Sequence, residues 1–107
     1  MRTVQRYKAD FFKAMGHPLR LALLERLVDG PRSVSTLAAD IALDLPNTSR
    51  HLAQLRTAGV IEAEREGTTT VYRLSDPGIG EILSAARHIM MRQLHLTQEM
   101  LKDLTDE

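Results

Sequence analysis

Between Ser33 and Gly59 the chain carries start and stop signals for two short helices that have only a few residues between them. Ser33 and Asp44 have side-chain oxygens that favour the N-cap position, and Pro46 fits the first turn that follows Asp44. Gly59 favours the position just after the end of a helix. Two short helices joined by so tight a turn form a helix-turn-helix, so this fold is predicted for residues 33–58. The two helices are expected at residues 34–41 and 45–58.

The sequence pattern changes from helical to strand-like directly after this pair. Residues 60–65 and 69–74 flank Glu66-Gly67-Thr68, a turn sequence that contains glycine. Asp76-Pro77-Gly78 then ends the hairpin. A β-hairpin that follows the second helix of a helix-turn-helix is a wing, so residues 60–75 predict a winged helix.

Helical periodicity continues on both sides of this unit. Apolar residues recur at helical spacing over residues 3–15, from Leu19 to Val28, and from Ile79 to about Leu104. His17 lies just before Pro18, where it is expected to cap or pack a helix rather than to bind a metal. The expected order is α-α-α-α-β-β-α, which is mainly helical with one hairpin, and 107 residues fit a single domain. Within residues 1–107 the expected parts are an N-terminal dimerisation helix (1–15), the helix-turn-helix (33–58), the wing (60–75) and a C-terminal dimerisation helix (79–104).

Composition excludes several classes of protein. The absence of cysteine rules out disulfides, thiolate metal sites and cysteine nucleophiles. No stretch approaches the roughly 18 consecutive apolar residues of a membrane span. The first ten residues lack a secretory core, so a cytoplasmic protein is expected. The sequence has no Gly-rich phosphate loop and no HExxH motif, and Ser49 and His51 lie on diverging helical faces, which argues against an enzyme. The formal net charge is zero, so nucleic-acid binding would need locally concentrated positive charge.

The second helix of the helix-turn-helix concentrates such charge. Between Leu45 and Val60 there are two arginines, one histidine and no acid. If Leu52 and Leu55 face the core, the opposite face presents side chains that can hydrogen-bond to base edges. These candidate DNA-reading residues are Asn47, Arg50, His51 and Gln54, with Arg56 better placed for a phosphate. The alternative is an ordinary solvated face or a protein-contact surface.

The wing supplies a second set of candidates. Arg65, Thr68 and Arg73 could contact phosphates or a minor groove. The alternative is an exposed turn whose threonines reflect β-propensity. Three glutamates, at positions 62, 64 and 66, make this wing less positive than such a contact would favour.

Three stretches of the chain resemble the winged-helix repressors of the ArsR/SmtB family. They are KAMGHPLR at residues 13–20, SRHLAQLRTAGVI at residues 49–61, and REG with VYRL at residues 65–67 and 71–74. The resemblance implies a homodimeric repressor that binds double-stranded operator DNA and responds to an inducer. It also implies a dimer interface made by the first and last helices. The interface residues expected on this basis are Tyr7, Phe11, Ile82, Leu83, Ala86, Met90 and Leu94. A two-fold dimer places its recognition helices about 34–36 Å apart, so the operator should be an inverted repeat.

Neither metal site of that family matches this chain. The positions of a thiolate pair hold Ser33 and Ser35, whose hydroxyls are poor ligands for soft metals. The positions of a second ligand set fall at Asp76, Gly78, Ile89 and Arg92, of which only the first suits a metal. No resident cofactor is therefore expected.

One further polar row lies on the last helix. Glu81, His88 and His95 recur every seven residues, and Glu99 follows one turn later. This row is typical of a solvated face, and the weaker alternative is a non-standard zinc site made by His88, His95 and Glu99. The sequence thus favours a sequence-specific repressor over two alternatives, a winged-helix protein-interaction module and a metal-responsive repressor with such a site.

Overall fold

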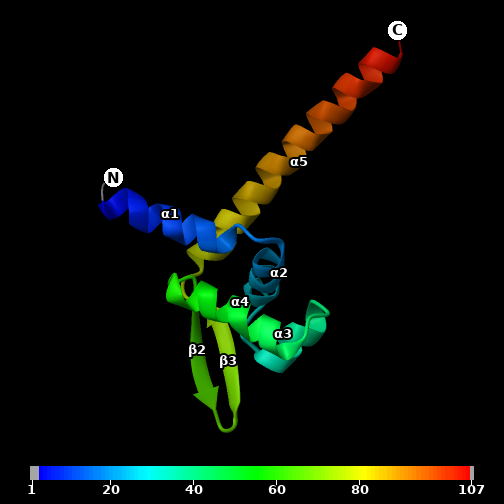
Figure 1. Cartoon of the computed structure of the whole chain (residues 1–107). Helices are drawn as coiled ribbons and strands as arrows, with labels where there is room; N and C mark the ends of the chain where they lie inside the picture. The colour runs from blue at the N-terminus through cyan, green and yellow to red at the C-terminus, as the bar shows by residue number, and fades with distance from the viewer. Residues whose placement is uncertain (1–2, 107) are drawn as a thin grey trace.

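The computed structural model describes residues 3–106 and confirms the predicted winged helix-turn-helix (Figure 1). The helices are α1 (Thr3–Met15), α2 (Pro18–Val28), α3 (Val34–Asp40), α4 (Leu45–Thr57) and α5 (Gly78–Thr105). The strands are β1 (Arg32–Ser33), β2 (Ile61–Glu66) and β3 (Thr69–Leu74). The predicted segments differ from these only at their ends. Residues 1 and 2 of the predicted N-terminal helix lie outside the described residues.

Side-chain caps start three of the helices. The cap atoms are His17 Nδ1, Ser33 Oγ and Asp44 Oδ2, which accept hydrogen bonds from the backbone N–H groups of Leu19, Thr36 and Asn47 at 3.1, 3.2 and 2.9 Å. The first N–H groups of a helix have no partner within it, so each cap satisfies one of them. The predicted capping roles of all three residues are confirmed.

The sheet contains one strand more than the sequence predicted. β1 pairs antiparallel with β3, and the strand order is β1-β3-β2. Two residues are too few to show alternation, so β1 is defined only by its pairing. In the wing, Glu66 pairs with Thr69 and leaves Gly67 and Thr68 as the turn. Gly67 has a φ of 63°, a left-handed conformation that glycine adopts without steric cost.

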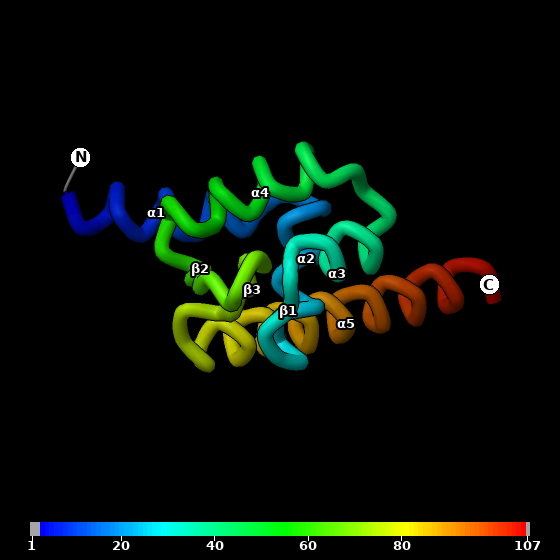
Figure 2. Tube along the Cα trace, turned by 90° about the horizontal axis from the view of Figure 1, so that it is seen from below, coloured from blue at the N-terminus to red at the C-terminus, as the bar shows by residue number. Residues whose placement is uncertain are grey.

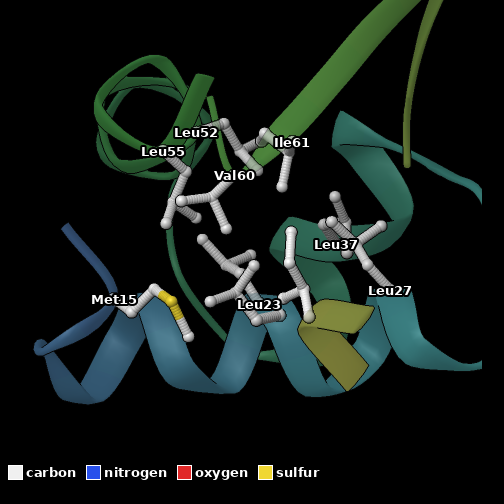
Figure 3. Packing of buried hydrophobic residues seen from close by; sticks show 10 residues of the cluster. Met15, Leu23, Leu27, Leu37, Leu52, Leu55, Val60 and Ile61 are labelled. Atoms are coloured by element: carbon white, nitrogen blue, oxygen red, sulfur yellow. The ribbon is translucent and has the colours of Figure 1, made fainter. Parts of the chain in front are cut away.

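The core lies between α2, α3, α4 and the base of the wing (Figure 3). Leu23, Leu37, Leu52 and Leu55 are fully buried there, and Ile61 joins them from β2. Burial of one such side chain stabilises a fold by about 1.5–3 kcal/mol. These contacts fix the rotation of α4 about its axis, because the face with Leu52 and Leu55 points inward and the opposite face must point outward.

The last helix projects beyond this core. Of α5's 28 residues only Ile79 is buried, and its C-terminal part extends away from the body on the side opposite the wing (Figure 1). The radius of gyration is 17.3 Å. A compact chain of this length would have about 13 Å. The difference reflects the length of α5, whose residues 87–105 are all exposed within the described part of the chain. No helix among residues 3–106 is long and apolar enough to cross a membrane.

The predicted interface residues divide into two groups. Tyr7, Ile82, Met90 and Leu94 are exposed, whereas Phe11 and Leu83 are half-buried against the core. Ala86 is half-buried as well. Phe11 and Leu83 therefore already contribute to the packing of the single chain, and only part of their surface is free.

Candidate nucleic-acid interface

The polar face of α4 lies open to solvent because the other face is anchored. Leu52 and Leu55 are fully buried, and so is Thr48, whose Oγ1 donates to the carbonyl oxygen of Asp44 at 2.9 Å. Opposite these residues, Arg50 and Gln54 are exposed. The structure thus presents a guanidinium and a carboxamide, two groups suited to base edges, on the outside of α4.

A chain of hydrogen bonds organises the start of this face. Besides its cap bond, Asp44 accepts a hydrogen bond at Oδ1 from Asn47 Nδ2 at 2.7 Å. Asn47 Oδ1 in turn accepts a hydrogen bond from Arg50 Nη2. The backbone and side-chain hydrogen bonds from Asn47 lower the pKa of Asp44, and the charge of Arg50 acts in the same direction. Both the side-chain nitrogen and the side-chain oxygen of Asn47 therefore already form hydrogen bonds. Arg50 keeps further N–H groups that can bind a base or a phosphate.

The prediction that His51 points outward is wrong. His51 is 8% exposed and lies against the rest of the protein. Arg20 Nε donates a hydrogen bond to His51 Nδ1 at 3.2 Å, and the His17 and His51 rings have centroids 4.6 Å apart. On α4, His51 follows Arg50 by one residue, a turn of about 100°, which carries it from the outer face toward the inner one.

Arg20 of α2, which contacts α4 through His51, was not identified from the sequence. It precedes Leu23 and Leu24 by three and four residues, so it lies on the same face of α2 as those buried leucines. A single cation on an otherwise apolar face of a helix was the available signal. Such a charge needs a polar partner, and here the partners are His51 and the carbonyl oxygen of Ala14.

The C-terminal part of the α4 face adds a second cation. Arg56 is exposed in the last turn of α4. In both views α4 runs alongside α1, and the wing leaves the body beside it (Figures 1 and 2). The outer face of α4 is thus flanked by the wing on the same molecule.

The wing residues differ in how much charge they leave free. Arg73 forms a salt bridge with Glu64 on the neighbouring strand. Arg65 donates from Nε to the carbonyl oxygen of Gly67 at 3.3 Å and stays exposed at the tip, as does Thr68. Arg65 and Thr68 are therefore better available to a ligand than Arg73.

The polar row on α5 forms one close pair. His95 Nε2 lies 3.2 Å from Glu99 Oε1, and both side chains are exposed. Across residues 3–106, no group of three histidine or acidic side chains is close enough to hold a metal ion. His88 lies on the exposed surface of α5 and takes part in no such group.

Comparisons with known proteins agree on one family. Residues 15–64 match the model of a helix-turn-helix domain family. An HTH-type transcriptional regulator of Mycobacterium tuberculosis is 42% identical over 98 residues, which cover 91% of this chain and 86% of the relative. The crystal structure of that protein superposes with a TM-score of 0.81 at 40% identity, covering 89% of this chain and 96% of the other.

Two further matches extend this result. A biofilm growth-associated repressor of Xylella fastidiosa is 33% identical, with 79% of this chain and 75% of the relative covered. The homodimeric winged helix-turn-helix DNA-binding domain of a possible ArsR-family regulator from Mycobacterium bovis superposes with a TM-score of 0.80 at 27% identity, covering 85% of this chain and 84% of the other. With its winged fold and its exposed polar α4, the chain belongs to the ArsR-type helix-turn-helix transcriptional regulators.

Proposed function

We propose that two copies of this protein bind an inverted-repeat operator and repress transcription from it, in the cytoplasm. The observation that carries the proposal is the outer face of α4, where Arg50 and Gln54 are exposed while Leu52 and Leu55 anchor the opposite face. In this arrangement Arg50 binds a guanine edge and Gln54 an adenine edge in the major groove. Asn47 holds Arg50 in position from one side.

Contacts to the DNA backbone complete the proposed interface. In this proposal Arg56 at the exposed end of α4 binds a phosphate, and the exposed Arg65 and Thr68 at the wing tip bind a phosphate or the minor groove. Arg73 contributes less, because Glu64 already compensates its charge. His51 is not part of this surface, because it is buried.

The exposed apolar surface of the single chain supports the proposal that two copies form a dimer. Tyr7 on α1 is 72% exposed, and Met90 and Leu94 on α5 are 62% and 53% exposed. A patch of this kind on a small protein is typical of a protein interface. The related M. bovis domain is homodimeric, which supports the same assembly here. A two-fold axis through α1 and α5 would present both α4 helices to one side of a duplex, about 34–36 Å apart.

Selection of bound fragments from a random DNA pool tests this function. The expected product is an inverted repeat whose half-sites are about one helical turn apart. Its affinity should fall steeply as salt rises, since each phosphate contact releases condensed counterions. The selection is repeated with zinc, with nickel and with a chelator to test for a metal-dependent site. Failure to enrich any sequence, with salt-independent capture of proteins instead, would favour an interaction module.

A further inference from the structure

A polar cluster lies on the inner side of α4, the proposed recognition helix, and the DNA contacts proposed above do not use it. His17, Arg20 and His51 form this His51 cluster, which joins three helices. Arg20 Nε donates to His51 Nδ1 of α4 at 3.2 Å, and Arg20 Nη1 donates to the carbonyl oxygen of Ala14 near the end of α1 at 3.3 Å. Arg20 therefore connects the recognition helix to the C-terminal end of the proposed dimerisation helix α1.

The hydrogen bonds of the cluster require uncharged imidazoles. His17 Nδ1 accepts from the backbone N–H of Leu19, and His51 Nδ1 accepts from Arg20. A protonated imidazole carries N–H on both nitrogens and can accept no hydrogen bond. A proton on His51 would therefore remove the bond from Arg20 and place a second positive charge beside the guanidinium.

The charges around His51 all disfavour that proton. The ring of His17 and the guanidinium of Arg20 face His51 from the start of α2, and Arg50 is its neighbour on α4. From α1, the Ala14 carbonyl oxygen accepts a hydrogen bond from Arg20. The salt bridges among residues 3–106 include none to His51. Burial lowers the pKa of His51, and the positive charges of Arg20 and Arg50 lower it further.

We propose that the His51 cluster is a proton-sensitive joint, which holds α4 in its DNA-binding position only while His51 is uncharged, so that acidification releases the operator. This inference rests on the proposed DNA-binding function. When His51 gains a proton, repulsion from Arg20 separates α4 from α2 and from the end of α1. The α4 face with Arg50 and Gln54 then no longer keeps the position that the operator requires.

The direction of the pH effect distinguishes this joint from general electrostatics. Protonation of any exposed histidine adds positive charge and strengthens attraction to phosphates. Protonation of His51 is predicted to weaken operator binding instead. The unfolded chain takes up this proton more readily than the folded one, so the stability contributed by the neutral cluster is present above the ordinary histidine pKa of about 6.5 and is lost as pH falls below it.

The test compares three forms of the full chain on the selected operator at about pH 8 and at one pH unit below the His51 midpoint that NMR titration of the wild type gives. His51→Asn keeps an acceptor near the position of Nδ1 but cannot be protonated. The matched control replaces the two exposed histidines of α5 in one variant, H88N/H95N. At the lower pH we expect wild type and control to bind roughly tenfold more weakly, because about nine-tenths of His51 is then protonated, and H51N to change by less than about twofold.

The outcomes separate this inference from the function on which it rests. If wild type enriches no operator at the higher pH, the proposed function fails. If wild type binds the operator equally well at both pH values, or if H51N loses affinity like wild type, the function stands and the joint is overturned. NMR titration of the His51 ring in wild type tests the joint even if H51N fails to fold. A midpoint at or above the ordinary value of about 6.5 would also overturn the joint.

Discussion

Two helices of this protein expose a long face to solvent, and the two faces have opposite chemistry. The outer face of α4 carries Arg50, Gln54 and Arg56, whereas the exposed face of α5 carries Met90 and Leu94. A guanidinium and a carboxamide gain from a polyanion with base edges, while methionine and leucine gain from another apolar surface. The proposed partners of the two faces therefore differ: DNA for α4 and a second copy of the chain for α5.

The two faces also differ in how firmly the protein holds them. α4 is anchored by fully buried leucines and by the His51 cluster, so its outer face is presented in a fixed orientation. α5 has only Ile79 buried and extends away from the core (Figure 1). A DNA-binding face gains affinity when its orientation is fixed before DNA binds, whereas the orientation of a dimerisation face can be fixed by the partner subunit.

The largest effect is expected from breaking the apolar face. Met90→Glu would bury two carboxylates in the dimer interface, where an unpaired charge is costly. We expect the dissociation constant of the dimer to rise by about a hundredfold or more, equivalent to roughly 2.7 kcal/mol. Sedimentation across a concentration series measures it. Because both half-sites must be bound together, operator affinity should fall in parallel.

The matched control for that substitution lies on the polar side of the same helix. Lys102→Glu introduces the same side chain on the exposed end of α5, on the face away from the apolar stripe. The dimer should survive this change. A dimer that also survives Met90→Glu would place the interface elsewhere.

The second prediction concerns the polar face alone. Arg50→Ala should cost about 1–3 kcal/mol on the selected operator and less on random DNA, because a lost base contact matters only where the right base is present. The dimer dissociation constant should stay at the wild-type value. Fluorescence anisotropy on both DNAs measures the difference, and equal losses on both would make Arg50 a phosphate contact.

Much of this comparison could be predicted from the sequence. Caps at Ser33 and Asp44, the break at Gly59 and the spacing of the leucines are local signals, and they defined the helix-turn-helix and the inner face of α4. The strand β1 could not be found this way, because its two residues have no pattern of their own and are held by pairing with β3.

The candidate site was predicted less completely, for two physical reasons. His51 precedes the buried Leu55 by four residues, so it lies at the edge of the inner face of α4, and Arg20 of α2 supplies the polar partner that its burial needs. The charge of Arg73 was visible in the sequence, but its partner Glu64 is brought beside it only by the strand register. Both corrections depend on contacts between segments that local periodicity does not describe.

The third prediction separates the two roles of Asp44. Asp44→Ala should cost about 1 kcal/mol in the free energy of unfolding, because the N-cap is lost. Asp44→Ser keeps a cap oxygen but lacks the second oxygen that accepts from Asn47 Nδ2. We expect Asp44→Ser to unfold near the wild-type denaturant midpoint while losing about two- to tenfold in operator affinity, the value of one net hydrogen bond. Wild-type affinity in Asp44→Ser would show that the carboxylate acts only as a cap.

The smallest effect is expected in the wing, where two arginines differ in their partners and in their distance from the tip. Arg73 pairs with Glu64 across the strands, whereas Arg65 donates to the Gly67 carbonyl oxygen and stays exposed at the tip. Arg73→Ala should change operator affinity by less than about twofold, because Glu64 already compensates the charge of Arg73 in an exposed, weak ion pair. Arg65→Ala, if Arg65 binds a phosphate, should reduce the slope of log affinity against log salt by about 0.9, and Arg73→Ala should leave that slope unchanged. Equal slopes in both variants would remove the wing from the interface and leave α4 as the proposed DNA contact.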